Sequence, residues 1–438
     1  MRTAPDVIEP AHGEVSRPAR WVWAVAVLAL CHATAVATFQ ILNILVEPIK
    51  AALHVTDTQF SLMQGLAVAI FASLLGIPAA LVADHGSRRL VVLVGVVIWS
   101  AATVACGTAQ SFSQLFAARM LVGVGEAFLY PAALSMIADV APPNRLSTAI
   151  GAFGCGGPIG TALALIGGGW LVRNQGSVAW DIPWAASELW RAAFLICGAS
   201  GAVAAGLLLT ISEPRHRRVS ESFEKYLGAT VLHVRRHWKV FAGVSGAMLA
   251  LSYCVFATSS WSPTTLVRVH GMTYANVAPI IGLAALFGGA LGAWVAGLVT
   301  DKIEASGHRD GALQVAMAVS ALILITTVAA VLTPSPEGAA MFLCITYSLL
   351  GMPTVLGGTA LQQISPPAIR AQVMAVQVLL VNLIALSLGP LTVAALTDHV
   401  FGRPAAVGYA LMWTNGLGAL VAIGAILACR RRFSEQRR

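Results

Sequence analysis

The sequence is short of charged residues. Only 11% of its 438 residues are Asp, Glu, Lys or Arg, whereas 57% are hydrophobic. A soluble protein carries about 25% charged residues, so this chain cannot cover a water-facing surface of ordinary polarity. The shortage of charge argues against a soluble enzyme, a nucleic-acid-binding protein or a disordered scaffold. It favours a protein that crosses a membrane several times.

Motifs of enzymes and bound cofactors are also missing. The chain contains no H-E-x-x-H zinc motif and no G-x-S-x-G nucleophile motif. Its seven cysteines form no C-x-x-C pair, which argues against a disulfide framework or a metal site. We therefore expect no enzymatic activity and no organic or metal cofactor. The net charge of +8 is typical of basic cytoplasmic loops, and we expect no nucleic-acid partner.

Long apolar runs are the main feature that the sequence does have. A helix needs about 20 apolar residues to cross roughly 30 Å of hydrocarbon. The chain has two sets of six such runs, which we number as spans 1 to 12 in chain order. They lie at 21–49, 59–83, 90–109, 112–138, 146–172, 190–211, 240–267, 276–299, 312–333, 338–363, 370–397 and 408–429. The pattern predicts an all-α membrane protein of twelve transmembrane helices in two six-helix repeats.

The distribution of basic residues predicts the orientation of these spans. With the N-terminus inside, 21 Lys and Arg residues fall on the cytoplasmic side and 5 on the opposite side. This bias predicts that both termini are cytoplasmic, and the short outward loops are typical of a bacterial inner membrane. We expect cytoplasmic tails at 1–20 and 431–438, six-helix bundles at 21–212 and 240–430, and a cytoplasmic linker at 213–239. The linker is either a short amphipathic helix on the membrane surface or a flexible tether.

The two halves share a short repeat. Gly65–Ala67 reads Gly-Leu-Ala and recurs as Gly282–Ala284, 217 residues later, and at the same offset Asp84 matches Asp301. Two parallel six-span repeats usually form a binding site between them near the middle of the membrane. This organisation is more typical of transporters than of membrane enzymes or receptors.

The loop between spans 2 and 3 carries a family motif. Residues 80–89, Ala-Leu-Val-Ala-Asp-His-Gly-Ser-Arg-Arg, match G-x-x-x-D-[RK]-x-G-[RK]-[RK] except at Ala80, His85 and Ser87, and 297–302 repeat its first part. The chain thus resembles the major facilitator superfamily, and within it the spinster-like branch, on Trp99-Ser100, Arg119-x-x-x-Gly123-x-Gly125-Glu126-Ala127, Ala138-Asp139 and 388–402. The resemblance implies a functional monomer, alternating access, and gating roles for Asp84, Arg88, Arg89 and Asp301.

Span 4 contains the strongest candidate site. Glu126 lies near its centre, and Arg119 lies two turns earlier on the same face. Ionisable residues at this depth are costly and are usually functional. Glu126 is a candidate proton carrier, and Arg119 is a candidate partner for an anionic substrate or for Glu126 itself. The alternative is a static buried ion pair that orders the bundle.

Span 1 departs from the spinster-like pattern. An Asp-Arg pair that the family uses in proton coupling is replaced by Thr38 and Phe39, neither of which titrates. His32, about 16 Å beyond Trp21, is a candidate replacement as proton carrier. The alternative is a neutral histidine that is hydrogen-bonded within the bundle. Whether transport is coupled to protons therefore stays open.

Other polar residues within the spans are candidates for the substrate cavity. They are Gln40, Asn43, Tyr130, Tyr253, Ser259, Trp261, Tyr347, Gln362, Asn382 and Asn415. The spinster-like resemblance favours Tyr130, Trp261 and Asn382 among them. For each residue alone, an interhelical hydrogen bond or an anchor at the membrane interface is the alternative.

The sequence thus predicts a secondary active transporter of the lipid bilayer. The resemblance implies a small amphipathic substrate with an anionic or zwitterionic group, such as a lysophospholipid, with proton symport as the coupling to test. A cavity with one arginine, one glutamate and otherwise apolar walls suits such a molecule. Three alternatives stay open: a symporter of small organic anions, a drug exporter, and an uncoupled facilitator.

Overall fold

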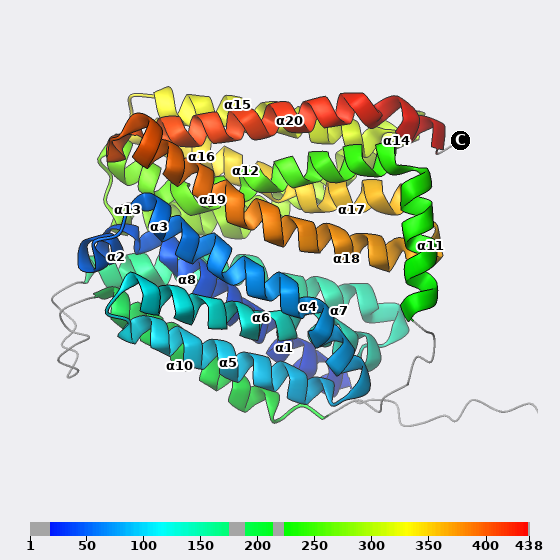
Figure 1. Ribbon diagram of the computed structural model, residues 1–438, viewed down its shortest axis with the longest axis horizontal. Helices are drawn as coiled ribbons and strands as arrows, with labels where there is room; N and C mark the ends of the chain where they lie inside the picture. Colours follow the sequence, from blue (N-terminus) through cyan, green and yellow to red (C-terminus); the bar gives the residue numbers. More distant parts are fainter. Residues whose placement is uncertain (1–17, 175–188, 213–222, 437–438) are drawn as a thin grey trace, which may run out of the picture.

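The computed structural model describes residues 18–174, 189–212 and 223–436, and within these ranges the chain forms helices and no strands. The helices form two bundles that lie side by side, with most helices along the long axis of the molecule (Figure 1). The first bundle contains α1 (Pro18–Gln40), η1 (Ile41–Ile44), α2 (Val46–Leu53), α3 (Asp57–Ser61), η2 (Leu62–Leu66), α4 (Ala67–His85), α5 (Arg88–Thr108), α6 (Phe112–Val140), η3 (Pro143–Arg145), α7 (Leu146–Gly154), α8 (Gly156–Arg173) and α10 (Leu189–Leu208).

The second bundle follows α11 (Phe223–Arg236). It contains α12 (Trp238–His270), α13 (Tyr274–Leu283), η4 (Ala284–Gly288), α14 (Gly289–Ala305), α15 (Gly311–Leu332), α16 (Pro336–Leu350), α17 (Met352–Ile364), η5 (Pro367–Ile369), α18 (Arg370–Leu380), η6 (Val381–Ala385), α19 (Leu386–Ala395), η7 (Leu396–Phe401), η8 (Pro404–Ala406) and α20 (Val407–Gln436). Several spans are therefore composed of two or more of these elements.

Twelve segments of the described chain are long and apolar enough to cross a membrane. Each overlaps one of the twelve spans that the sequence predicts, so the predicted number and order of spans are confirmed. Polar caps help to define where several spans begin. Thr56 and Gln59 form a reciprocal capping box at the start of span 2, and Ser87, Ser111 and Ser335 cap α5, α6 and α16.

Span 1 is shorter than the sequence predicts. The apolar run at 21–49 was expected to form one helix, but the spanning segment ends at Ile44 and a separate helix, α2, follows. Pro48 explains the break, because a proline has no N–H to donate to the carbonyl four residues earlier and its ring crowds that carbonyl. That carbonyl belongs to Ile44, the last residue of η1. The interruption turns the chain and brings the charges of α2 to the end of the bundle.

The linker contains a helix, α11, which lies crosswise to the spans at one end of the molecule (Figure 1). It packs against the second bundle, where the His233 ring lies 3.4 Å from the carbonyl oxygen of Ile364 at the end of α17. The two alternatives for the linker were a short helix and a flexible tether. The described part of the linker is a helix. We refer below to the α11 end of the molecule and, opposite it, to the α2 end, which also holds α13.

Small residues allow the helices of one bundle to lie close together. Gly123 of α6 packs on α4, and a Cβ at this position would lie 2.4 Å from the Val68 carbonyl oxygen. Van der Waals packing of this kind replaces the hydrophobic effect as the main attraction between helices in lipid. The close approach fixes α6 against α4 next to Glu126.

Replacing Gly123 with Ala is expected to destabilise the first bundle, because the methyl group would collide with backbone that cannot rotate away. Overpacking of this kind typically costs about 1–3 kcal/mol. Thermal unfolding in detergent should show a lower midpoint for Gly123→Ala than for the wild type. Gly167→Ala is the matched control, since a Cβ there meets nothing within 4 Å. Equal midpoints for the two variants would contradict this account.

Candidate functional site

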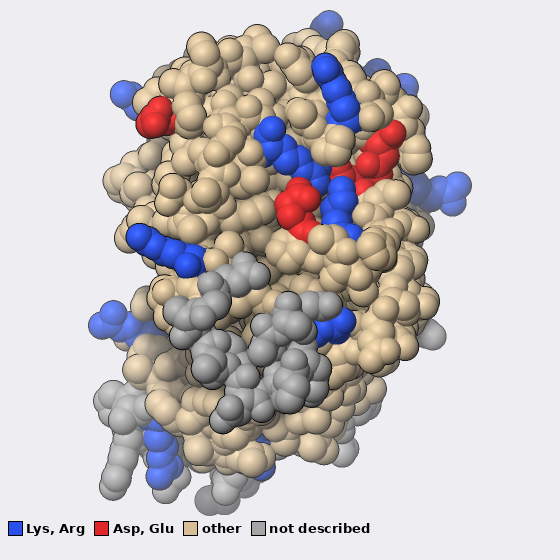
Figure 2. Space-filling model, turned by 90° about the vertical axis from the view of Figure 1, so that its left-hand side faces the viewer, with Lys and Arg blue, Asp and Glu red and all other residues tan. Residues whose placement is uncertain are grey.

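Four charged side chains join the two bundles at the α2 end. The Arg268 guanidinium, near the end of α12, donates to Glu47 Oε1 at 2.6 Å and to the two Asp57 carboxylate oxygens at 2.6 and 2.9 Å. Lys50 forms an ion pair with the same Asp57 carboxylate. Acidic and basic side chains lie side by side on this face (Figure 2). We call Glu47, Lys50, Asp57 and Arg268 the α2-end ion cluster.

The centre of this cluster is withdrawn from water. The Asp57 side chain is 1% exposed and the Arg268 side chain 7%, whereas the Glu47 side chain is 43% exposed. A buried carboxylate needs its partners, since removing one of them leaves an uncompensated charge. The Asp57–Arg268 pair therefore favours close contact between the bundles, and Glu47 contributes less because water screens it.

Spans 2 and 11 are joined at the same end by further hydrogen bonds. The backbone N–H and the hydroxyl of Thr58 both donate to Asp398 Oδ2, each at 2.7 Å. One turn further along span 2, the Ser61 hydroxyl donates to the Pro390 carbonyl oxygen at 3.2 Å. These bonds connect α3 with α19 and η7, so they also link the first bundle to the second.

A layer of uncharged polar groups lies next to the ion cluster, farther from the α2 end. The Asn43 amide donates to Gln40 Oε1 at 2.8 Å and to the Ser259 carbonyl oxygen at 3.0 Å. The Gln64 amide donates to Asn43 Oδ1, and the Tyr347 hydroxyl lies 3.4 Å from the same Ser259 carbonyl. The structure thus brings together four predicted cavity residues, Gln40, Asn43, Ser259 and Tyr347, in an interface between the bundles.

Arg119 is fully buried in the first bundle without a carboxylate partner among the described residues. Its Nε donates to the Met63 carbonyl oxygen at 3.4 Å and its Nη1 to the Thr38 carbonyl oxygen at 3.5 Å. Its Cζ lies 5.6 Å from the centre of the Phe39 ring. Nη2 has no hydrogen-bond partner in the part of the chain that the structure describes. Thr38 and Phe39 thus contact Arg119, but they supply a carbonyl oxygen and a ring face where a carboxylate would neutralise it.

Glu126 lies fourteen residues from each end of α6 and is partly exposed. Among the described residues it forms no hydrogen bond and no direct ion pair, although its charge and that of Arg119 attract each other without contact. One turn later Tyr130 is half exposed, with 50% of its surface accessible. Glu126 and Tyr130 therefore form an accessible face near the middle of span 4.

His32 lies against this face. Its ring meets the Tyr130 ring edge-on, with centroids 5.6 Å apart, and stacks on Phe153 at 4.8 Å. Its Nδ1 lies 3.1 Å from the Phe153 carbonyl oxygen, to which an N–H at that nitrogen would donate. His32 is therefore hydrogen-bonded within the bundle and makes no bond to Glu126 in the described structure, but it lies beside the accessible Tyr130.

Two other predicted cavity residues lie elsewhere. Trp261 is 1% exposed, and its indole N–H donates to the Pro390 carbonyl oxygen at 3.0 Å. It packs edge-on against Phe60 of span 2, with ring centroids 6.4 Å apart. Trp261 therefore fills the interface beside the α2-end ion cluster. Asn382 is partly exposed in η6 of span 11.

The predicted gating residues lie at the α11 end. Arg88 forms an ion pair with Asp139, and Arg89 donates to the Ile211 carbonyl oxygen at 2.8 Å, so both contact their own bundle. Asp301 is exposed. The backbone of Asp84 is in the last turn of α4, but its side chain lies outside the described part of the structure. Their gating role stays a prediction.

The acidic members of the ion cluster, Glu47 and Asp57, are not among the site residues predicted from the sequence. Lys50 and Arg268 are two of the five basic residues that were counted on the side opposite the cytoplasm. A signal was present: Asp57 begins span 2 only seven residues after Lys50, at a membrane face with few charges. Gln64, which is fully buried with an unpaired Oε1, was also missed.

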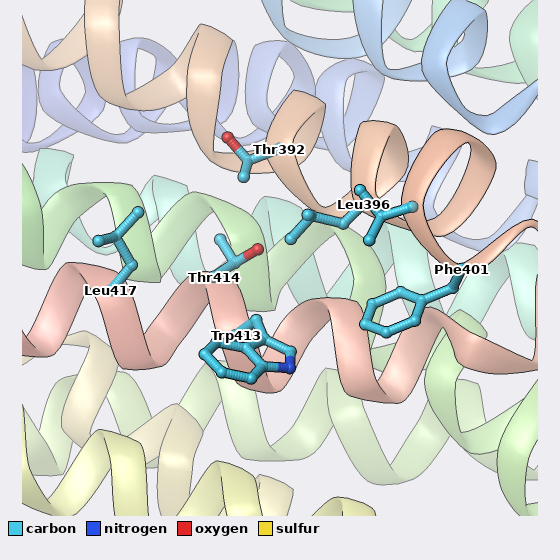
Figure 3. Close-up of a pocket in the computed structure, with 7 residues that line it drawn as sticks. Thr392, Leu396, Phe401, Trp413, Thr414 and Leu417 are labelled. Atoms are coloured by element: carbon cyan, nitrogen blue, oxygen red, sulfur yellow. The ribbon is translucent and has the colours of Figure 1, made fainter.

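A separate groove lies on the second bundle between α19, η7 and α20 (Figure 3). Its volume is about 450 Å³, and the hydroxyls of Thr392 and Thr414 donate to carbonyl oxygens of their own helices. The remaining lining is apolar: Leu396, Val400, Phe401, Trp413 and Leu417. Because its lining is mostly apolar, the groove suits hydrocarbon rather than the charged part of a substrate. None of the predicted site residues lines it. The described residues contain no cluster of potential metal ligands.

Comparisons with known proteins agree with this architecture. The model of the Major Facilitator Superfamily matches residues 28–390. An MFS-type efflux pump of Mycolicibacterium smegmatis is 28% identical over 395 residues, which cover 90% of this chain and 88% of the pump. A cis,cis-muconate transport protein of Acinetobacter baylyi is 22% identical over 374 residues, which cover 82% of this chain and 84% of that protein.

A solved structure extends the comparison to the whole fold. A bacterial homologue of the human lysosomal transporter Spinster, in an inward-facing and unoccupied conformation, has a TM-score of 0.77 and is 24% identical. The match covers 96% of this chain and 97% of that one. The same homologue in its occupied conformation is 25% identical, with a TM-score of 0.76. The predicted resemblance to the spinster-like branch is thus confirmed, and the chain belongs to the Major Facilitator Superfamily as a multi-pass membrane transporter.

Proposed function

We propose that this transporter is a secondary active carrier that works by alternating access, and that the structure corresponds to its inward-facing state. The observation that carries the proposal is the placement of contacts between the bundles. The buried Asp57–Arg268 pair and the polar layer around Asn43 join them at the α2 end, while Tyr130 in the middle of span 4 is half exposed. A carrier closed at one end gives its central site access from the other.

The distribution of charge supports a cytoplasmic location for the α11 end. The segments that the sequence predicts to be cytoplasmic, which include both termini and α11, contain 21 of the 27 basic residues, as expected for that side of the membrane. The Spinster homologue was also solved in inward-facing conformations. We therefore propose that both termini are cytoplasmic, in the inner membrane of a bacterium, and that the carrier acts as a monomer.

The proposed substrate is a small amphipathic molecule with an anionic or zwitterionic group. Arg119 supports this class because a buried guanidinium with an unpaired N–H is costly and would gain from an anion. Glu126 would attract the cationic part of a zwitterion or a proton. The Phe39, Tyr130 and Phe153 rings nearby offer apolar contact for the remainder. A lysophospholipid combines these properties.

Glu126 is the proposed proton carrier, since it is the accessible carboxylate of this face and has no fixed partner in the described structure. Thr38 does not replace the missing Asp of span 1, because its hydroxyl donates to the Thr34 carbonyl oxygen within α1. His32 is the proposed second proton carrier, on account of its contact with the exposed Tyr130. Transport without any proton movement is the alternative that the loss of the Asp-Arg pair leaves open.

A small organic anion is the second candidate substrate. The unpaired Nη2 of Arg119 would serve a carboxylate as well as a lipid phosphate, and one relative is named a cis,cis-muconate transport protein. Drug export is the third candidate function, because one relative is an MFS-type efflux pump of Mycolicibacterium smegmatis. These substrates differ in size and in apolar surface, so presenting them one at a time separates the alternatives.

Reconstituted carrier is expected to move protons when a lysophospholipid is added, and Glu126→Gln is expected to abolish this movement. The amide keeps the shape of the side chain but has no proton to exchange at neutral pH. The measurement is the internal pH of dye-loaded proteoliposomes, together with uptake of labelled lysophospholipid and, separately, cis,cis-muconate. Glu337→Gln is the control, because Glu337 is an exposed carboxylate in the first turn of α16.

The other outcomes of this experiment are equally informative. Lysophospholipid uptake without proton movement in the wild type would contradict coupling and indicate an uncoupled facilitator. Uptake of cis,cis-muconate but not of lysophospholipid would overturn the lipid-like substrate in favour of an organic anion. Proton movement that survives in Glu126→Gln would exclude Glu126 as the carrier.

Replacing His32 with Gln is expected to remove the pH dependence of uptake between about pH 5 and 8, the range in which a histidine normally changes charge. Glutamine can still donate to the Phe153 carbonyl oxygen, so packing should be kept. Initial uptake rates across this range are the measurement, with His308→Gln in the exposed loop before α15 as the control. A pH profile identical to that of the wild type would show that His32 has only a structural role.

A further inference from the structure

The Gly-Leu-Ala repeat lies where the two bundles touch. Gly65 is in η2 of span 2, and a Cβ on it would lie 2.5 Å from the Leu386 carbonyl oxygen in span 11. Gly282 is in α13 of span 8, and a Cβ on it would lie 2.8 Å from Cγ1 of Ile166 in span 5. Each glycine of the repeat thus belongs to one bundle and packs on the other.

Other glycines of the same spans do not have this property. Among the described residues, a Cβ on Gly76 in α4 or on Gly297 in α14 would meet nothing within 4 Å. Gly123 is as closely packed as Gly65, but its neighbour Val68 belongs to the same bundle. Gly169 strengthens the second crossing, since a Cβ there would lie 2.2 Å from the Ala278 Cβ, one turn before Gly282. At the crossings between the bundles, the absence of a side chain allows the helices to approach closely.

Both crossings lie on the α2 side of the molecule and next to irregular turns. Gly65 comes eight residues after Asp57, within the π-helical segment η2. Gly282 comes eight residues after Tyr274, in the last turn of α13, which the π-helical segment η4 follows. Irregular turns of this kind often mark functional positions in helices. The halves of the chain therefore place equivalent glycines at equivalent contacts of the closed end.

We infer that Gly65 and Gly282 are positioning residues that set the balance between the conformation closed at the α2 end and a conformation open there. The inference rests on the proposed alternating access. Contacts between packed surfaces fall off steeply with separation, and a methyl group at either crossing would hold the bundles apart. An added side chain at Gly65 or Gly282 thus disfavours the closed α2 end and leaves the packing within each bundle unchanged.

Gly65→Ala and Gly282→Ala are each expected to raise the ratio of the open to the closed population at the α2 end, by roughly tenfold on the usual cost of overpacking. The measurement is the distance distribution between spin labels at Ala51 and Arg403, which are exposed at the α2 end on different bundles. Labels are attached to cysteines at these positions after the native cysteines are replaced. Gly76→Ala and Gly297→Ala are the matched controls and should keep the wild-type ratio.

A compensating substitution separates positioning from misfolding. The obstacle at Gly282 is a side chain, so Ile166→Ala should restore the wild-type ratio in Gly282→Ala, whereas no side-chain change can relieve the Leu386 carbonyl facing Gly65. An unchanged ratio in Gly65→Ala and Gly282→Ala would overturn the inference. So would a Gly282→Ala variant that fails to fold with or without Ile166→Ala.

The spin-label distances are measured without substrate. The experiment can therefore contradict the role of the glycines without contradicting the proposed function. One distance population in the wild type and in every variant would contradict both alternation and the role of the glycines. Two populations whose ratio ignores the glycine substitutions would leave alternation intact and overturn the inference alone. The expected result is two populations whose ratio changes in Gly65→Ala and Gly282→Ala but not in the control variants Gly76→Ala and Gly297→Ala.

Discussion

The Asp57–Arg268 ion pair is the interaction on which the arrangement of the two bundles depends. It is buried, it joins residues 211 positions apart, and it links a short helix turn of the first bundle to the end of α12. Separating the bundles at this end leaves Asp57 with Lys50 alone and takes both carboxylates away from Arg268, which must then be hydrated or stay unpaired at a large free-energy cost. The polar layer around Asn43 and the close crossings at Gly65 and Gly282 follow from the same approach of the bundles.

Farther from the α2 end, the molecule contains two opposite charges that attract each other without direct contact. Arg119 is buried against Thr38 and Phe39, and Glu126 is partly accessible and makes no direct ion pair in the described part of the structure. Such an arrangement is poorly stabilised by the protein alone, because an isolated buried charge is costly in a membrane. A substrate with an anionic group would provide the missing partner. The α2 end is thus closed by the ion cluster, whereas Arg119 near the centre still lacks a direct partner in the described structure, which a substrate could supply. A carrier that works by alternating access needs both features.

Much of the fold could be predicted from the sequence, because the length of an apolar run is a local property that the bilayer selects. The twelve spans were predicted in this way, but the end of span 1 was not, since it depends on Pro48 acting on the Ile44 carbonyl. Glu126 could be found because charge is rare at that depth. Asp57 and Arg268 could not be paired, because the contact links opposite halves of the chain. Trp261 was predicted to line the cavity because its partner is also distant in the sequence. Its hydrogen bond to the Pro390 carbonyl oxygen, which shows that it lies in the interface, is visible only in the folded structure.

The most direct test of this account is the access of water-soluble reagents to the polar layer from the α2 side. Ser259→Cys, without the seven native cysteines, would be exposed to a membrane-impermeant thiol reagent in sided vesicles. Asp57→Asn is predicted to speed its modification at least roughly tenfold, because it leaves Arg268 and Lys50 without their buried carboxylate. Glu47→Gln should have a smaller effect, since Glu47 is 43% exposed. Equal rates in Asp57→Asn and in the parent would contradict the claim that the ion cluster closes the α2 end.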